Sequence, residues 1–158
     1  MRIIVGADHA GFTLKSTVVE ALCAWGHEVQ DVGTHTSESI DFPVVARRVC
    51  DPLRAGVFER GVMVCGTGIG AAMAANKIPG IRAALCHDVY SAHQCVEHDD
   101  ANVLCLGAQI VGDRLALDLL RTFLDARMND EEHFKRRVHQ LAELEREAAR
   151  ELGSAPQP

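Results

Sequence analysis

The stretch Val62–Ala71, VMVCGTGIGA, decides the fold. Its apolar start predicts a strand over Gly61–Cys65, and three alternating glycines then lead into helix-favouring residues at Ala71–Asn76. A buried strand that passes through a glycine turn directly into a helix is typical of an α/β protein with a parallel sheet.

The same alternation continues on both sides of this stretch. Apolar runs predict four further strands, at Arg2–Ala7, His27–Val32, Ile81–Cys86 and Asn102–Gly107. Helical patterns separate or follow them, at Gly11–Trp25, Phe42–Arg54, Val89–Glu97 and Asp113–Ala126. Strands this apolar, separated by helices, predict one α/β domain in which a five-stranded parallel sheet is covered by helices on both faces.

An extra helix is expected near the carboxyl end, over Asp130–Leu152. Apolar residues recur there at spacings of three and four and form one stripe: Phe134, Val138, Leu141, Leu144, Ala148 and Leu152. The stripe fits packing either on a partner subunit or back on the same domain, and the pattern leaves both open. We assign residues 1–152 to one domain and expect residues 153–158 to form a disordered tail.

Composition narrows the class of protein. The chain has 158 residues, 47% of them hydrophobic, which suits one folded domain and excludes global disorder. A net charge of −6 without interleaved basic and aromatic residues disfavours nucleic-acid binding. The six cysteines include no C-x-x-C pair, so no metal site is expected. With no signal peptide and no membrane-spanning run, we expect a cytoplasmic protein with reduced thiols.

Ligands of parallel α/β sheets collect at the carboxyl ends of the strands, and this points first to Cys65. The turn Gly66–Gly70 exposes backbone N–H groups at a helix start, an arrangement suited to binding an anion. The same field favours a thiolate at Cys65, a candidate base or nucleophile, and Thr67 offers a hydroxyl donor. A tight turn around a buried cysteine is the plainer interpretation of the same residues.

Two other polar groups lie next to predicted strands. Asp8 and His9 end the first strand and suit the positioning of a substrate hydroxyl or the sharing of a proton, although Asp8 is also a candidate helix N-cap. His98 stands among acids just before the fifth strand, in a segment that is otherwise an ordinary surface loop.

A different class of function stays open. Gly66-x-Gly68-x-x-Ala71 loosely matches the dinucleotide fingerprint, and Asp88 follows the next strand at nearly the spacing of a ribose-binding carboxylate. A cysteine directly before the first glycine is not part of that mechanism. The alternative function is an NAD(P)-binding oxidoreductase.

At these residues the sequence resembles the ribose-5-phosphate isomerase B family, also called the ribose/galactose isomerase family. The resemblance covers about residues 1–150 and rests on motifs in the family's order: 6–11 (GADHAG), 41–43 (DFP), 65–70 (CGTGIG), 74–77 (AANK) and 102–104 (NVL). It implies a Rossmann-like three-layer α/β/α sandwich and an aldose–ketose isomerase that needs no metal or other cofactor. It also implies a homodimer, or a dimer of dimers, with active sites at the subunit interface.

The resemblance implies that Cys65 is the base, which moves a proton between C1 and C2 of ribose 5-phosphate through an enediolate. Other members use a Glu just after the last glycine, where this chain has Ala71. Thr67 and the amides of the turn, Gly66, Gly68, Ile69 and Gly70 included, stabilise the developing oxyanion.

The resemblance also assigns substrate contacts. His98 assists opening of the sugar ring with Asp8 nearby, and His9 contacts the phosphate. Arg137 is a second phosphate contact and reaches in from the partner's terminal helix.

Three substrate-binding positions depart from the family's usual residues. Asp99 stands where the family has Asn, Gln109 where it commonly has Arg, and His133 where it usually has the first phosphate-binding Arg. Two cations near the phosphate are therefore replaced or titratable. A related sugar phosphate as substrate, or a sugar-phosphate-binding protein without turnover, follow as alternatives.

Overall fold

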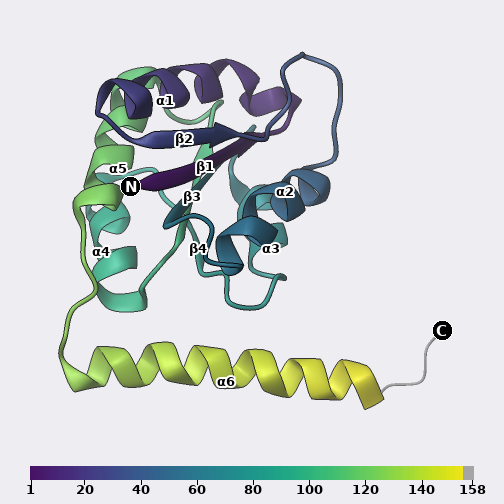
Figure 1. The fold of residues 1–158 in the computed structure, drawn as a ribbon, viewed down its shortest axis with the longest axis vertical. Coiled ribbons are helices and arrows are strands. Elements are labelled where there is room, and N and C mark those ends of the chain that lie inside the picture. Colours follow the sequence, from purple (N-terminus) through teal and green to yellow (C-terminus); the bar gives the residue numbers. More distant parts are fainter. Residues whose placement is uncertain (155–158) are drawn as a thin grey trace.

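A computed structural model describes residues 1–154, and it confirms the α/β class. Five parallel strands form one sheet in the order β2-β1-β3-β5-β4 (Figure 1). Their bounds are β1 Arg2–Ala7, β2 Glu28–Asp31, β3 Arg60–Cys65, β4 Ala83–Leu85 and β5 Val103–Gly107. The register pairs Ala7 with Val64 and Cys65 with Gly107, so the carboxyl ends of β1, β3 and β5 meet at one edge of the sheet.

Helices cover both faces of this sheet. They are α1 Phe12–Ala24, α2 Phe42–Arg54, α3 Ile69–Ala75, α4 Val89–Asp99, α5 Asp113–Asp125 and α6 Glu132–Ser154, with a 3-10 turn η1 at His9–Gly11. The helices α1, α4 and α5 bury apolar side chains against one face, and α2 and α3 cover the other (Figure 1). The structure therefore has the three-layer α/β/α architecture that the alternating pattern predicts.

Both edge strands are shorter than the apolar pattern predicts. The strand β4 holds three residues of the expected Ile81–Cys86 run and pairs with β5, and asparagine side chains bond to the backbone around its amino end. The Asn76 side chain accepts from the Ala83 N–H at 2.9 Å and donates to the Ala83 carbonyl oxygen at 2.8 Å. The Asn102 side chain accepts from the Arg82 N–H at 2.9 Å. At the other edge, β2 spans Glu28–Asp31 of the expected His27–Val32.

Several helix ends also differ from the sequence pattern. The first helix begins at Phe12, one residue late, because Asp8 caps η1 instead. The helix α3 begins at Ile69, two residues early, inside the glycine turn. The helix α4 continues past Glu97 through His98 and Asp99, and it ends where Asp100 adopts a left-handed conformation with φ of 49°.

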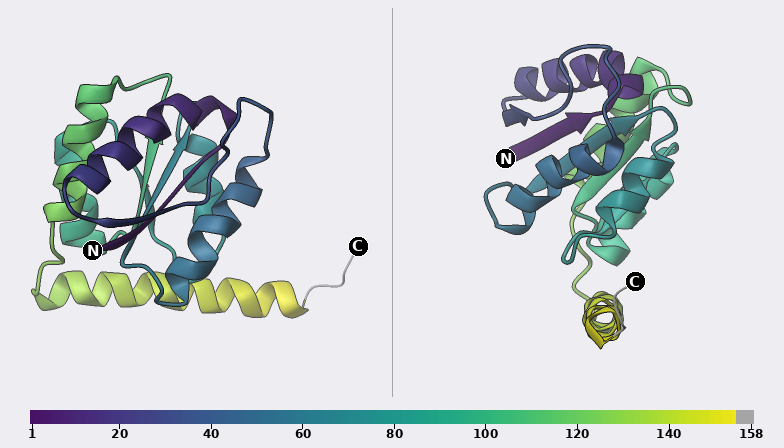
Figure 2. Two further views of the ribbon diagram at one scale, coloured as in Figure 1. Left: turned by 45° about the horizontal axis from the view of Figure 1, so that its top comes forward. Right: turned by 90° about the vertical axis from the view of Figure 1, so that its right-hand side faces the viewer.

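The helix α6 lies apart from the sandwich, across the amino-terminal side of the sheet (Figures 1 and 2). Its Phe134 is buried, and Glu145 accepts a hydrogen bond from the Gly80 N–H at 3.0 Å. It includes Gly153 and Ser154, which the sequence placed in a disordered tail, while residues 155–158 of that tail lie outside the described residues. Within residues 1–154, no helix combines the length and apolar character needed to cross a membrane.

Candidate active site

Cys65 lies at the carboxyl end of the central strand β3 and is 6% exposed. Its Sγ accepts a hydrogen bond from the Gly68 N–H at 3.0 Å, which fixes the sulfur beneath the turn. Gly68 has φ of +79°, and a Cβ there would lie 2.4 Å from Leu85 Cδ1. Only glycine suits this position, so the turn that aims an amide at the sulfur is built into the sequence.

Thr67 is exposed at the top of this turn, where its hydroxyl can meet a ligand. Its Oγ1 also accepts from the Ile69 N–H at 3.4 Å. Two of the amides expected to face an anion, those of Gly68 and Ile69, are thus engaged within the turn itself. The turn is folded tightly around Cys65 and still presents Thr67 outward.

The neighbouring strands bring three further predicted residues to this edge. Asp8 is 8% exposed, and its Oδ1 accepts from the N–H groups of Ala10 (3.0 Å) and Gly11 (3.1 Å), so it caps η1. His9 is exposed, and its Nδ1 accepts from the Ile40 N–H at 3.4 Å, which leaves Nε2 as the outward donor of the neutral ring. The Gln109 N–H donates to the Gly66 carbonyl oxygen at 2.9 Å.

The structure adds residues that the sequence did not single out. The ring of Phe42 lies against Gly70, where an added Cβ would be 3.2 Å from Cε1 of the ring. Gly107 faces Cys65 across the β3–β5 ladder, and a Cβ on it would lie 2.6 Å from the Thr67 carbonyl oxygen and 3.0 Å from His87 Nε2. Phe42 belongs to the DFP motif, and His87 and Gly107 lie where the fourth and fifth predicted strands end, at the edge where ligands of such sheets collect.

The other predicted residues lie at the opposite edge of the sheet. The helix α4 follows β4 and returns to the start of β5, so its last turn, with His98 and Asp99, lies near the amino ends of the strands. The proximity of Asp8 and His98 in an interface site stays a prediction, and within one chain the two residues lie at opposite edges of the sheet. Helix direction is the cause, because a crossover helix runs antiparallel to the strands that it joins.

The side chains of this second group of residues lie around the ring of Phe134. The His98 ring stacks on it with centroids 4.2 Å apart, and the His133 ring lies 3.9 Å away on the same residue. The Arg137 guanidinium lies 5.7 Å from the Phe134 centroid, and Glu131 pairs with His133 at 3.3 Å. Imidazole and guanidinium groups thus gather at the start of α6, an arrangement suited to a phosphate.

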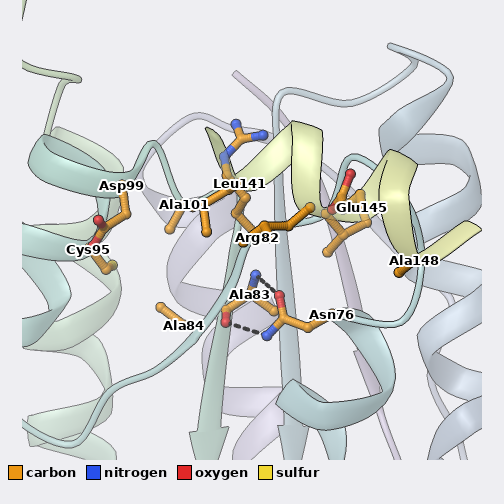
Figure 3. Close-up of a pocket in the computed structure, with 12 residues that line it drawn as sticks. Asn76, Arg82, Ala83, Ala84, Cys95, Asp99, Ala101, Leu141, Glu145 and Ala148 are labelled. Atoms are coloured by element: carbon orange, nitrogen blue, oxygen red, sulfur yellow. Dashed lines mark hydrogen bonds between the residues drawn. The ribbon is translucent and has the colours of Figure 1, made fainter. Parts of the chain in front are cut away.

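A groove of about 460 Å³ runs between α6 and the β4 edge (Figure 3). Its lining combines Cys95, Asp99 and Arg82 with the apolar side chains of Leu141 and Leu144. The guanidinium of Arg82 is held by Asp100, with an NH2–Oδ2 distance of 2.6 Å. The groove therefore adjoins the second group of residues and lies away from Cys65.

Asp88 bears on the dinucleotide alternative. Its Oδ1 accepts from the Ser91 N–H and its Oδ2 from the Ser91 hydroxyl, both at 2.8 Å. The backbone hydrogen bond from Ser91, more than any other contact, holds the pKa of this carboxyl below its ordinary value. Asp88 is the N-cap of α4, so the carboxylate proposed for a ribose is already engaged.

Metal-binding side chains do not converge in the part of the chain that the structure describes. Among residues 1–154, no three or more His, Cys, Asp or Glu side chains gather closely enough to hold a metal ion. The expectation that the reaction needs no metal stays a prediction.

Known proteins are similar to this chain in both sequence and fold. Residues 3–141 match the sequence model of the Ribose/Galactose Isomerase family. Ribose-5-phosphate isomerase B of Escherichia coli is 40% identical over 144 residues, covering 91% of this chain and 96% of the relative. D-erythrulose-4-phosphate isomerase of Pectobacterium atrosepticum is 40% identical over 127 residues, covering 80% and 84%.

A solved structure agrees with these sequence relatives. Ribose-5-phosphate isomerase B of Clostridium thermocellum superposes with a TM-score of 0.91 at 42% identity, covering 94% of this chain and 99% of that one. The matched region includes both the Cys65 turn and the end of α4. On sequence and fold together, the chain belongs to the Ribose/Galactose Isomerase family.

Proposed function

We propose that this sugar-phosphate isomerase interconverts ribose 5-phosphate and ribulose 5-phosphate, with Cys65 as the base. The observation that carries the proposal is the buried Cys65 sulfur, held at a strand end by the Gly68 N–H beside the exposed Thr67 hydroxyl. The sugar-phosphate isomerases among its relatives support the same chemistry. A cytoplasmic location stays a prediction.

The reaction moves one proton from C2 to C1 and one proton from O2 to O1. In its thiolate form, Cys65 removes the C2 proton of the open-chain aldose, the C1–C2 double bond forms, and the carbonyl oxygen O1 takes the negative charge. The Thr67 hydroxyl and amides of the turn donate to that oxyanion, and preorganised donors of this kind lower the barrier strongly. A proton then moves from O2 to O1, and Cys65 returns its proton to C1, which yields the ketose.

A complete site on this plan requires two copies of the chain. Cys65, Thr67 and His9 lie at the carboxyl ends of the strands, whereas His98 and Arg137 lie at the amino ends. The helix α4 between these edges has 11 residues, so its length is about 16 Å at 1.5 Å per residue. We infer that His98 and Arg137 of one subunit complete the Cys65 site of the other, so that ring opening and phosphate binding come from the partner.

Exposed apolar side chains supply the surface for such a dimer. Ile69 and Met73 on α3 are 52% and 63% exposed, and Phe42 at the start of α2 lies beside them against Gly70. On α6, Leu144 and Leu152 are 60% and 78% exposed. Large apolar side chains exposed beside both halves of an incomplete site favour burial against a second subunit.

A four-carbon substrate is the second candidate. One relative at 40% identity is named D-erythrulose-4-phosphate isomerase, and Asp99 places an exposed carboxylate beside His98. A carboxylate accepts hydrogen bonds but donates none, so Asp99 selects for substrate hydroxyl donors.

The test is exchange of the C2 proton in deuterated water, followed by NMR over four-, five- and six-carbon aldose phosphates. We expect exchange with ribose 5-phosphate and a loss of about 10²–10⁴-fold in kcat for Cys65→Ala. Cys50→Ala is the matched control, because Cys50 is also fully buried on the same side of the sheet but lies on α2. Exchange by Cys65→Ala at the wild-type rate contradicts Cys65 as base. If the wild type binds ribose 5-phosphate tightly without exchanging its C2 proton, the protein is a sugar-phosphate-binding protein. Saturable binding of NADPH supports the alternative of an oxidoreductase.

A further inference from the structure

The sheet divides the cysteines into two sets. Cys50, Cys65 and Cys105 are buried on the side covered by α2 and α3. Cys86 is buried on the opposite side, where Cys95 of α4 packs against the same cluster. The isomerase chemistry uses only Cys65, so the Cys86–Cys95 pair has no role in the proposed reaction.

These two thiols are in direct contact. The Sγ atoms of Cys86 and Cys95 lie 4.0 Å apart, with the Cys86 thiol as donor. Cys86 directly follows β4, and Cys95 lies in the second half of α4. A disulfide requires an S–S distance of about 2.05 Å, so the two sulfur atoms need to approach by about 2 Å. The proposed disulfide therefore requires rotation of the two side chains and a small shift of α4 toward Cys86.

The two sulfur atoms differ in access and in charge. Cys86 is 2% exposed, whereas Cys95 is half-buried and lines the groove under α6 (Figure 3). The hydrogen bond from Cys86 lowers the pKa of Cys95 below its ordinary value, and the same contact followed by burial raises the pKa of Cys86. Cys95 is therefore the thiol that reacts first, and Cys86 is the thiol that resolves the product.

We propose that Cys86 and Cys95 are a site of reversible oxidation, at which a hydroperoxide produces an intrachain disulfide. The Cys95 thiolate attacks one oxygen of the peroxide, an S–O bond forms as the O–O bond breaks, and the other oxygen leaves as an alcohol or water after taking a proton. Cys95 is then a sulfenic acid, oxidised by two electrons. The Cys86 sulfur attacks the Cys95 sulfur, the S–O bond breaks, and hydroxide leaves as water with the Cys86 proton. Two equivalents of an external thiol reverse the step.

Oxidation at this pair acts on the second group of site residues. Cys95 lies three residues before His98 and four before Asp99 on α4, so it is a neighbour of each on the helix surface. A shift of α4 toward Cys86 moves the His98 ring relative to Phe134, on which it stacks. This consequence for turnover rests on the proposed function, whereas formation of the disulfide does not.

The experiment is peptide mapping of the full chain after treatment with hydrogen peroxide. Chymotrypsin cuts after Tyr90, between the two cysteines, and a Glu-specific protease cuts after Glu97, between Cys95 and Cys105. We expect the Cys86 and Cys95 peptides to remain linked until dithiothreitol is added. In Cys86→Ser, and in Cys86→Ala as a second variant, Cys95 instead stays a sulfenic acid that dimedone traps. Oxidation of the exposed Cys23 without any Cys86–Cys95 link overturns the proposal.

Turnover is the second measurement. Oxidised wild type is expected to lose about tenfold in kcat/KM, because small misplacements of catalytic groups have large effects, and to recover with dithiothreitol. Cys86→Ser retains its activity under the same treatment, apart from any oxidation of Cys65 that both proteins share. Equal losses in wild type and Cys86→Ser contradict a regulatory role for the pair. An inactive wild type that still forms the link rejects the proposed function and leaves the oxidation site standing.

Discussion

Lys15 lies on α1 and is 2% exposed, an unusual burial for an ammonium group. Its Nζ donates to Asp31 Oδ2 at 2.5 Å and to the Thr34 carbonyl oxygen at 2.7 Å. These bonds fasten the loop after β2, and the other end of that loop reaches His9 through the Ile40 N–H. A single buried charge thus orders the segment beside the proposed phosphate contact.

We expect Lys15→Met to lower the free energy of unfolding by about 3 kcal/mol, because it leaves Asp31 and Thr34 without their buried partner. The matched control is Lys135→Met, which removes an exposed ion pair to Asp130 at 3.2 Å and is expected to cost about 0.5 kcal/mol or less. Urea denaturation measures both variants. If both variants lose the same free energy of unfolding, the buried Lys15–Asp31 pair contributes no more to stability than an exposed ion pair.

Buried thiols predict how stability depends on alkaline pH. Burial raises the pKa of Cys50 from 9.0 to about 12, so the folded state keeps this thiol protonated after the unfolded chain has ionised. The stabilisation is complete below pH 9 and is lost as the pH rises from 9 toward 12. We expect the free energy of unfolding to fall over that window, and to fall less steeply in Cys50→Ala. Denaturant titrations across the window decide this, and identical slopes in the two proteins contradict it.

At the scale of secondary structure, two asparagine side chains hold the edge strand β4. Asn76 bonds to both backbone groups of Ala83, while Asn102 accepts from the Arg82 N–H and donates to the Gly80 carbonyl oxygen at 2.9 Å (Figure 3 for Asn76). Both residues stood in motifs that carried the family resemblance. The structure shows that their side chains bond to the backbone around the amino end of β4, in addition to its pairing with β5.

We expect Asn102→Ala to lower the free energy of unfolding by about 2 kcal/mol, since two backbone groups lose their partners. Asn102→Asp keeps the acceptor for Arg82 but sets a second acceptor oxygen against the Gly80 carbonyl oxygen, so it is also expected to lose stability. Gln140→Ala, at an exposed position on α6, is the control and is expected to be near neutral. Thermal denaturation ranks the three variants. If Asn102→Ala loses no more stability than Gln140→Ala, the hydrogen bonds of Asn102 do not stabilise the edge strand.

The elements show what a sequence can and cannot predict. Strand–turn–helix signals are local, so the pattern around Cys65 placed the residue correctly at the end of β3. The end of α4 carries no Gly or Pro, and Asp100 adopts the left-handed conformation that usually marks glycine, so the helix outlasts its predicted end. The pattern therefore predicts a loop at His98, whereas the residue lies in the last turn of α4, at the edge of the sheet opposite Cys65.

At the scale of the whole molecule, two edges of one sheet carry the two halves of the proposed site. The carboxyl edge holds Cys65, the proposed base, with the glycine turn, and the amino edge holds His98, His133 and Arg137 around Phe134. The direction of α4 separates the two groups within one chain, whereas the sequence pattern does not predict which surfaces of two folded copies meet. The apolar stripe on α6 fits packing either on a partner subunit or on its own domain. The separation of the two groups of residues favours packing on a partner.

Mixing two inactive variants tests this account most directly. Cys65→Ala and His98→Asn are each expected to lose isomerisation of ribose 5-phosphate, because every site in either homodimer lacks one group. In a mixed dimer, one site carries both substitutions and the other carries none. After subunit exchange at equal concentrations, about a quarter of wild-type activity is expected to return, since half of the dimers are mixed and half of their sites are intact. If activity stays absent although mixed dimers are detected by native mass spectrometry, Cys65 and His98 of different subunits do not share a site, and the account is contradicted.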